Sequence, residues 1–142
     1  MSMVSDLVAR LRAFSGLSAL VSTRIRPHVL SQGETYPAVA YYVTSQVDEG
    51  HLRGPGGLPV TEMTFDCYAS TYGGAEAVAD QIRLALDGYR GLMGSTRVQM
   101  AKVVDYRGEG YDWPDDASQA GYYRAGVDVR IVWEQTPAAL LT

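Results

Sequence analysis

The stretch Val60-Thr-Glu-Met-Thr-Phe-Asp-Cys-Tyr-Ala69 decides the fold of this chain. From Met63 to Ala69 its odd-numbered positions are apolar and the positions between them are polar or amphipathic, which predicts a strand with one buried face. Beyond a turn-prone segment, apolar residues recur at helical spacing, at Ala75, Val78, Ala79, Ile82, Ala85 and Leu86. This spacing predicts an amphipathic helix that Gly88 closes in the left-handed conformation. A strand with one apolar face followed by a helix with one apolar face predicts that the helix packs back on the sheet.

Other segments carry weaker versions of the same two periods. Apolar residues at helical spacing predict a first helix at residues 2–14 that Gly16 ends. Three more strands are predicted, at residues 38–45 from their Val and Tyr content and at residues 96–106 and 123–134 from the distribution of apolar residues on one face. Residues 17–21 could form a helical turn and residues 23–26 a short extended piece.

The strand at residues 96–106 has the least regular pattern. We expect Val98, Met100 and Val104 on one face, with Lys102 interrupting it. Because lysine is common on sheet edges, the interruption indicates an edge or a contact with a partner. A polar loop is expected to follow at residues 107–121.

These elements predict an α+β fold with a mainly antiparallel sheet of about four strands and two helices packed on one face, in the order α-β-β-α-β-β. A chain of 142 residues that is 46% hydrophobic can bury enough surface to fold as one domain. We therefore expect a single domain at residues 1–134 and a C-terminal tail at residues 135–142.

Composition argues against several classes of function. The net charge is −4, and eleven of the twelve basic residues are scattered arginines, so nucleic-acid binding is not the expected main activity. The single cysteine excludes an internal disulfide. No apolar run approaches the ~20 residues of a membrane span, and the N-terminus lacks a signal-peptide block. We expect a soluble protein assembled inside a cell, without a membrane partner.

No pattern predicts an active site. Cys67 could pair with His28 or His51 as nucleophile and base, but it lies in the apolar phase of a strand, where a buried core residue is expected. The acidic loop residues Asp112, Asp115 and Asp116 lack the ligand spacing of a calcium loop, and the glycines after the central helix lack the lysine of a phosphate-binding loop. We therefore expect no enzyme activity, no cofactor and no metal.

The order of features resembles the tail terminator, or tail completion, proteins of long-tailed phages and gene transfer agents. The resemblance runs from about Leu7 to Trp133 and rests on the order and spacing of short motifs. After the N-terminal helix these are Thr23-Arg-Ile-Arg-Pro27, Gln32-Gly33, Tyr36-Pro-Ala-Val-Ala-Tyr41, Leu52-Arg-Gly54 with Gly57-Leu58, Phe65-Asp-Cys-Tyr68 before the central helix, Tyr111-Asp112, and Tyr123-Arg-Ala-Gly-Val-Asp128.

The resemblance implies a structural role in the virion. Such proteins form a ring, usually hexameric, on the head-proximal end of the tail tube, where they end tube polymerisation and join the tail to the head connector. The implied partners are other copies of this chain, the tail tube protein and the head–tail connector protein. The implied location is the tail or neck of a virion assembled in the host cytoplasm. DNA could pass through such a ring without being bound specifically.

The second face of the predicted sheet is polar, with Glu62, Thr64, Asp66, Arg124, Asp128 and Arg130, and it could form charge pairs or line a lumen. The Gly- and Pro-rich loop at residues 46–59 and the apolar residues 138–141 are the other candidates for assembly contacts. The predicted subunit or tube interface therefore contains His51, Leu52, Arg53, Leu58, Arg124, Arg130, Leu140 and Leu141.

Two other functions remain open from the residues alone. The same polar face would simply be solvated in a protein-binding α+β domain unrelated to phages. A thiol-dependent enzyme centred on Cys67 is the other alternative.

Overall fold

The structure is a computed structural model that describes residues 3–30, 35–47, 58–112 and 121–134. The described helices are α1 (Met3–Ala13), α2 (Ser15–Val21) and α3 (Tyr72–Leu86). The described strands are β1 (Ile25–Pro27), β2 (Ala38–Val47), β3 (Val60–Ala69), β4 (Gly91–Met93), β5 (Thr96–Asp112) and β6 (Tyr122–Trp133).

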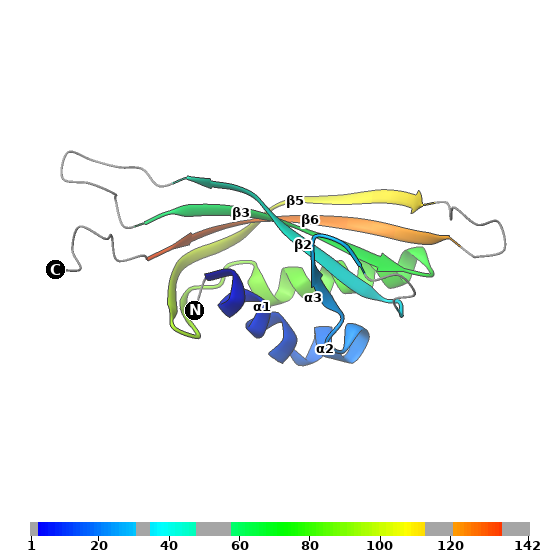
Figure 1. Cartoon of the computed structure of the whole chain (residues 1–142), viewed down its shortest axis with the longest axis horizontal. Coiled ribbons are helices and arrows are strands. Elements are labelled where there is room, and N and C mark those ends of the chain that lie inside the picture. The colour runs from blue at the N-terminus through cyan, green and yellow to red at the C-terminus, as the bar shows by residue number, and fades with distance from the viewer. Residues whose placement is uncertain (1–2, 31–34, 48–57, 113–120, 135–142) are drawn as a thin grey trace.

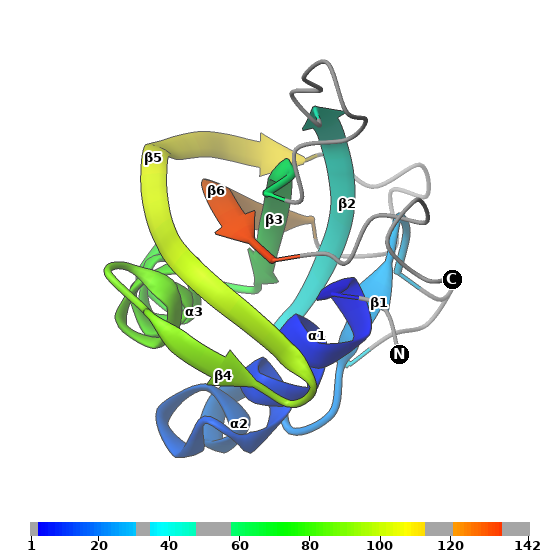
Figure 2. The same cartoon turned by 90° about the vertical axis from the view of Figure 1, so that its left-hand side faces the viewer.

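The strands form one sheet in the order β1-β2-β3-β6-β5-β4, in which β1 runs parallel to β2 and the other neighbours are antiparallel. The helices lie on one side of the sheet (Figure 1), and β5 curves strongly around the molecule (Figure 2). The α+β prediction is confirmed. The expected four strands and two helices were too few. The helical turn expected at residues 17–21 lies in α2 and the extended piece expected at residues 23–26 overlaps β1, whereas β4 is too short to show a clear period.

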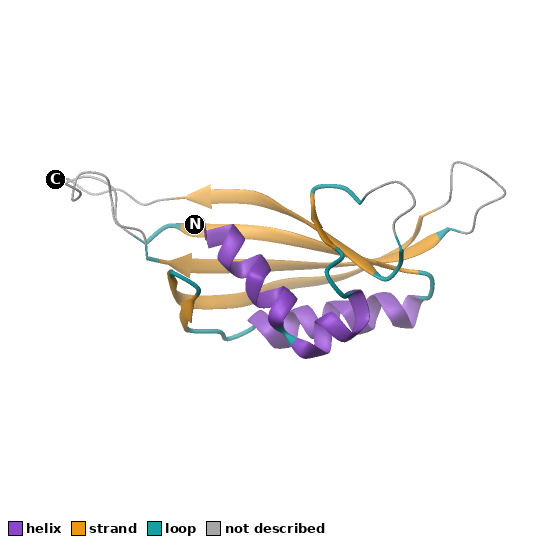
Figure 3. Ribbon diagram, turned by 60° about the horizontal axis from the view of Figure 1, so that its bottom comes forward, coloured by secondary structure: helices purple, strands orange, loops and turns teal. Residues whose placement is uncertain are grey.

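The central strand and helix are confirmed in detail. Met63, Phe65, Cys67 and Ala69 of β3 are buried, as are all six predicted apolar residues of α3. The Thr71 hydroxyl caps α3 by accepting a hydrogen bond from the Gly74 amide at 3.0 Å. Gly88 follows the helix with a φ of 79°. The helix lies across β3 and β6, so each element buries the apolar face of the other (Figure 3).

Gly16 does not end the first helix but lies inside α2. A Cβ atom at this position would come within 2.0 Å of the Gln81 Oε1 atom on α3. A side chain at this position would therefore have to displace the end of the Gln81 side chain.

Strand β5 differs from its prediction in length and in phase. It continues to Asp112, so the loop expected from residue 107 begins later than predicted. Val98 is buried, but Met100 and Val104 are exposed and Ala101 is buried in their place. The β5–β6 register shifts between residues 98 and 100, 103 and 105, and 108 and 110. Each such bulge changes which side chains face the core, which explains why a simple alternation failed.

Candidate assembly surface

The side of the sheet that faces away from the helices carries the predicted polar residues, and we call it the polar face. From Thr61 to Ala69 on β3 and from Ala125 to Ile131 on β6 the odd-numbered residues are buried, and alternation turns the even-numbered residues to the side away from the helices. All six residues predicted for this face lie there: Glu62, Thr64, Asp66, Arg124, Asp128 and Arg130.

Ion pairs and hydrogen bonds connect neighbouring strands of the polar face. Arg130 donates to the Glu62 Oε1 atom from Nε at 3.1 Å and from Nη2 at 2.9 Å. The Thr64 hydroxyl donates to Asp128 at 2.7 Å, and Arg107 donates both to Asp128 and, at 3.2 Å, to Asp105. Partly exposed pairs of this kind contribute little stability, ~0–1 kcal/mol each. Their main effect is to neutralise the face. Charge pairs were one of the two roles that the sequence left open for these residues, and the structure contains them.

The predicted interface residues fall into two groups. Arg124, Arg130 and Leu58 are described: both arginines lie on the polar face of β6, and Leu58 is 47% exposed just before β3. The predicted residues His51, Leu52, Arg53, Leu140 and Leu141 lie outside the described residues.

An aromatic cluster lies near Arg124 on the polar face. The rings of Tyr36 and Tyr68 each lie 5.2 Å from the ring of Tyr122. Burial raises the pKa of the Tyr68 phenol, against a hydrogen bond with Arg124 that lowers it. Tyr68 therefore stays protonated near neutral pH and can serve as a hydrogen-bond partner but not as a base.

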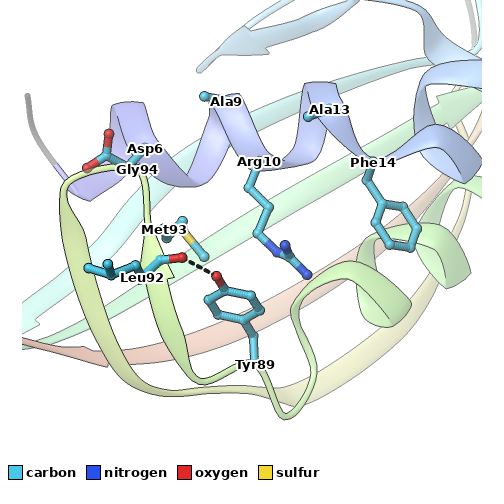
Figure 4. A pocket seen from close by; sticks show the side chains of 9 residues that line it. All are labelled: Asp6, Ala9, Arg10, Ala13, Phe14, Tyr89, Leu92, Met93 and Gly94. Atoms are coloured by element: carbon cyan, nitrogen blue, oxygen red, sulfur yellow. Dashed lines mark hydrogen bonds between the residues drawn. The ribbon is translucent and has the colours of Figure 1, made fainter.

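A groove of about 300 Å³ separates α1 from the β4–β5 hairpin (Figure 4). Arg10 crosses it, with its guanidinium carbon 3.9 Å from the centre of the Tyr89 ring and its Nε donating to the Ala85 carbonyl at 3.0 Å. The remaining lining is mostly apolar or small, with Ala9, Ala13, Phe14, Leu92, Met93 and Gly94. The cation–π contact and the hydrogen bond hold Arg10 against Tyr89 and Ala85. We therefore interpret the residues of the groove as packing α1 against the hairpin.

Asp6 lies at the end of this groove and is only 1% exposed. Its Oδ2 atom accepts hydrogen bonds from the Thr96 hydroxyl at 2.5 Å and the Ser95 hydroxyl at 3.2 Å. The bond from Thr96 is the main cause that lowers the pKa of Asp6, and burial opposes it. Asp6 is therefore ionised at neutral pH, where it joins α1 to the hairpin and does not act as a general acid.

The same hairpin requires a glycine at position 94. Gly94 has a φ of 59°, and a Cβ atom there would lie 2.6 Å from the Asp6 Oδ1 atom. Both the backbone conformation and the space beside Asp6 favour glycine.

The described residues do not place Cys67 beside His28, a pairing that the alternative of a thiol enzyme would use. Cys67 is fully buried, whereas His28 is exposed and stacks on Tyr42. Among the described residues no group of three His, Cys, Asp or Glu side chains could hold a metal ion. None of the described helices has the length and apolar character needed to cross a membrane.

Cys67 should behave as a core residue. Because its thiol is buried, a mild alkylating reagent should label the native protein slowly and the unfolded protein rapidly. Cys67→Ala should lower stability without preventing assembly, which native mass spectrometry can follow. Rapid labelling of the folded protein, accompanied by loss of assembly, would contradict this structural role.

Sequence reasoning missed Arg107, Asp6 and Arg10. Arg107 was assigned to a loop. The pairing of β5 with β6 resumes after each bulge, and allowing for bulges would have extended the predicted strand to Arg107. Asp6 and Arg10 gave no signal, since their partners Thr96 and Tyr89 lie far away in the sequence.

Comparisons with known proteins agree with this architecture. The family model described as tail completion protein gp17 matches residues 5–134. No curated protein matches the chain. A solved structure described as the virion of a native gene transfer agent particle contains a chain with a TM-score of 0.70 and 18% identity. The match covers 94% of this chain and 96% of that one.

At 18% identity the similarity to that structure shows the fold alone. The match to the family model confirms the predicted resemblance. The chain belongs to the tail completion protein gp17 family and is a structural protein of the tail of a phage-like virion.

Proposed function

We propose that this protein forms a ring, most simply a hexamer, on the head-proximal end of the tail tube. There it ends tube polymerisation and joins the tail to the head connector. The observation that carries the proposal is the match to the tail completion family over residues 5–134. The proposed partners are further copies of the chain, the tail tube protein and the connector protein, with DNA passing through the ring unbound.

Open edges on the two sides of the sheet support a head-to-tail ring. Within the described residues, β4 and residues 87–90 bond to the outer side of β5 as far as Val103, and beyond it β5 has a strand neighbour only on its β6 side. Strand β2 has a strand neighbour only on its β3 side after Tyr41. A head-to-tail ring requires two different surfaces on each subunit, and the two sides of this sheet provide them. The bulges in β5 interrupt a regular edge, which favours contacts through side chains over a continuous shared sheet.

The neutralised polar face also supports a structural role. Arg107 and Arg130 are paired with acids of their own subunit, so this face has no strong field of one sign that would hold DNA by its phosphates. We infer that the protein has no catalytic role. We also propose that residues 1–134 act as one domain and that the interface includes His51, Leu52, Arg53, Leu58, Arg124, Arg130, Leu140 and Leu141.

Native mass spectrometry of the purified protein tests the ring, and electron microscopy of tails made with and without it tests termination. Deleting residues 50–57 should leave thermal unfolding nearly unchanged while abolishing ring formation or normal tail length. The matched variant is His51→Ala, Leu52→Ala and Arg53→Ala, which keeps the loop length and removes the side chains. Normal rings and normal tail length in the deletion variant would show that the loop only connects β2 to β3. Unfolding of that variant would show that the loop belongs to the core.

A further inference from the structure

One end of the polar face carries apolar side chains in place of charges. Val47 pairs with Val60, Val60 with Val132, and Val132 with Met100, so the four residues cross four adjacent strands. We call them the apolar row. Val47 is 54% exposed and Met100 is 38% exposed, while Val60 and Val132 are half-buried. Exposed apolar side chains gathered in one place indicate a contact surface.

The apolar row differs sharply from its surroundings. The next row along the sheet contains Glu62, Arg130 and Lys102, and the described helices all lie on the opposite side (Figure 1). The described helices therefore leave the row uncovered, and an apolar segment is the occupant that its side chains favour.

The chain contains such a segment close to the row. Strand β6 ends at Trp133, directly after Val132 of the row, and residues 138–141 read Ala-Ala-Leu-Leu. The four steps from Glu134 to Ala138 span up to ~14 Å, which is enough to turn back over the end of the sheet. We propose that, in the free subunit, residues 138–141 dock on the apolar row of their own chain.

The lengths of the segment and the row agree. Three spacings between neighbouring strands make the row ~14 Å long, and four extended residues cover ~13 Å. The connection also favours the chain's own segment over that of a neighbour, because a short link holds it at an effective concentration in the millimolar range.

This docking would hide two apolar surfaces at once in a subunit that has not yet assembled. Leu140 and Leu141 would then become available to a neighbouring subunit only when assembly displaces them. The inference concerns the free subunit, so it stands or falls independently of the ring.

Cross-linking from position 140 tests the proposal. Subunits carrying Leu140→p-benzoylphenylalanine, one half labelled with ¹⁵N, are unfolded, mixed and refolded together before irradiation. Mass spectrometry should find position 140 joined to peptides that contain Val60, Met100 or Val132, with a single isotope in each product. Cross-links to other peptides, no cross-link, or products that combine both isotopes would overturn the proposal.

Variants of the row provide the matched comparison. The double variant Val60→Ser and Val132→Ser should lower the cross-link yield roughly tenfold, since its apolar contacts are lost. Met100→Ser should also lower the cross-link yield. Because Met100 is exposed, this variant should fold and replaces the double variant if that one does not. Leu84→Ser, at a residue of α3 that is 58% exposed, should leave the yield unchanged. An undiminished yield in the folded row variants contradicts docking on the row.

Discussion

Ile82→Ala should lower the free energy of unfolding by about 2–5 kcal/mol, a loss typical of truncating a large side chain in a core. Ile82 is fully buried on the face of α3 that packs against the sheet. Truncation removes apolar atoms from the core and leaves a cavity that the surrounding helix and strands can fill only partly. Urea denaturation followed by circular dichroism measures the loss.

The neighbouring residue Arg83 provides the control. Its side chain is exposed and lies 3.8 Å from Asp80 in an ion pair on the helix surface. Because exposed pairs contribute little, Arg83→Ala should cost far less than Ile82→Ala. Equal small losses for the two variants would show that α3 presents a different face to the sheet.

Asp6→Ala should have the second-largest effect, a loss of about 1–3 kcal/mol at neutral pH. The substitution leaves the buried Thr96 hydroxyl without the carboxylate that accepts its hydrogen bond, and it removes the link between α1 and the β4–β5 hairpin. Asp80→Ala is the matched control, because it removes an exposed carboxylate from a helix and should change stability little. Similar losses in the two variants would contradict a structural role for the buried carboxylate.

The contribution of Asp6 to the free energy of unfolding should also depend on pH. The pKa of Asp6 is lowered in the folded state, so the carboxylate binds its proton more weakly there than in the unfolded chain. The stabilisation is therefore complete above the unfolded pKa of about 4 and is lost as the pH falls through the folded pKa. Denaturation at several pH values should show a constant difference between wild type and Asp6→Ala from about pH 6 to pH 8. A difference that persists unchanged at about pH 2 would show that the charge is not its source.

The predictions that succeeded rest on long, regular elements. The alternation in β3 and β6 and the helical spacing in α3 correctly identified the buried residues, from Phe65 and Ile82 to Val129. They also placed Arg124 and Arg130 on the polar face, although their partners could not be assigned. The family was identified from the order of short motifs, and the family match confirms it.

The predictions that failed concern short or interrupted elements. Strand β4 has three residues, too few for a period to appear, and was not predicted. The short extended piece expected at residues 23–26 overlaps β1 but was not counted as a strand of the sheet. In β5, three bulges shift the alternation, so Met100 and Val104 were assigned to the wrong face and Arg107 to a loop.

The sequence by itself determined the α+β class, the buried faces of β3, α3 and β6, and the family to which the chain belongs. It could do so because burial of one face imposes a period on residues that are neighbours in the chain. Only the tertiary structure decided that Asp6 holds Ser95 and Thr96, that Arg107 joins Asp105 to Asp128, and that Val47, Val60, Val132 and Met100 meet in one row. Most of these contacts join residues far apart in the chain, and their partners are set by strand register and helix docking, which leave no local pattern in the sequence.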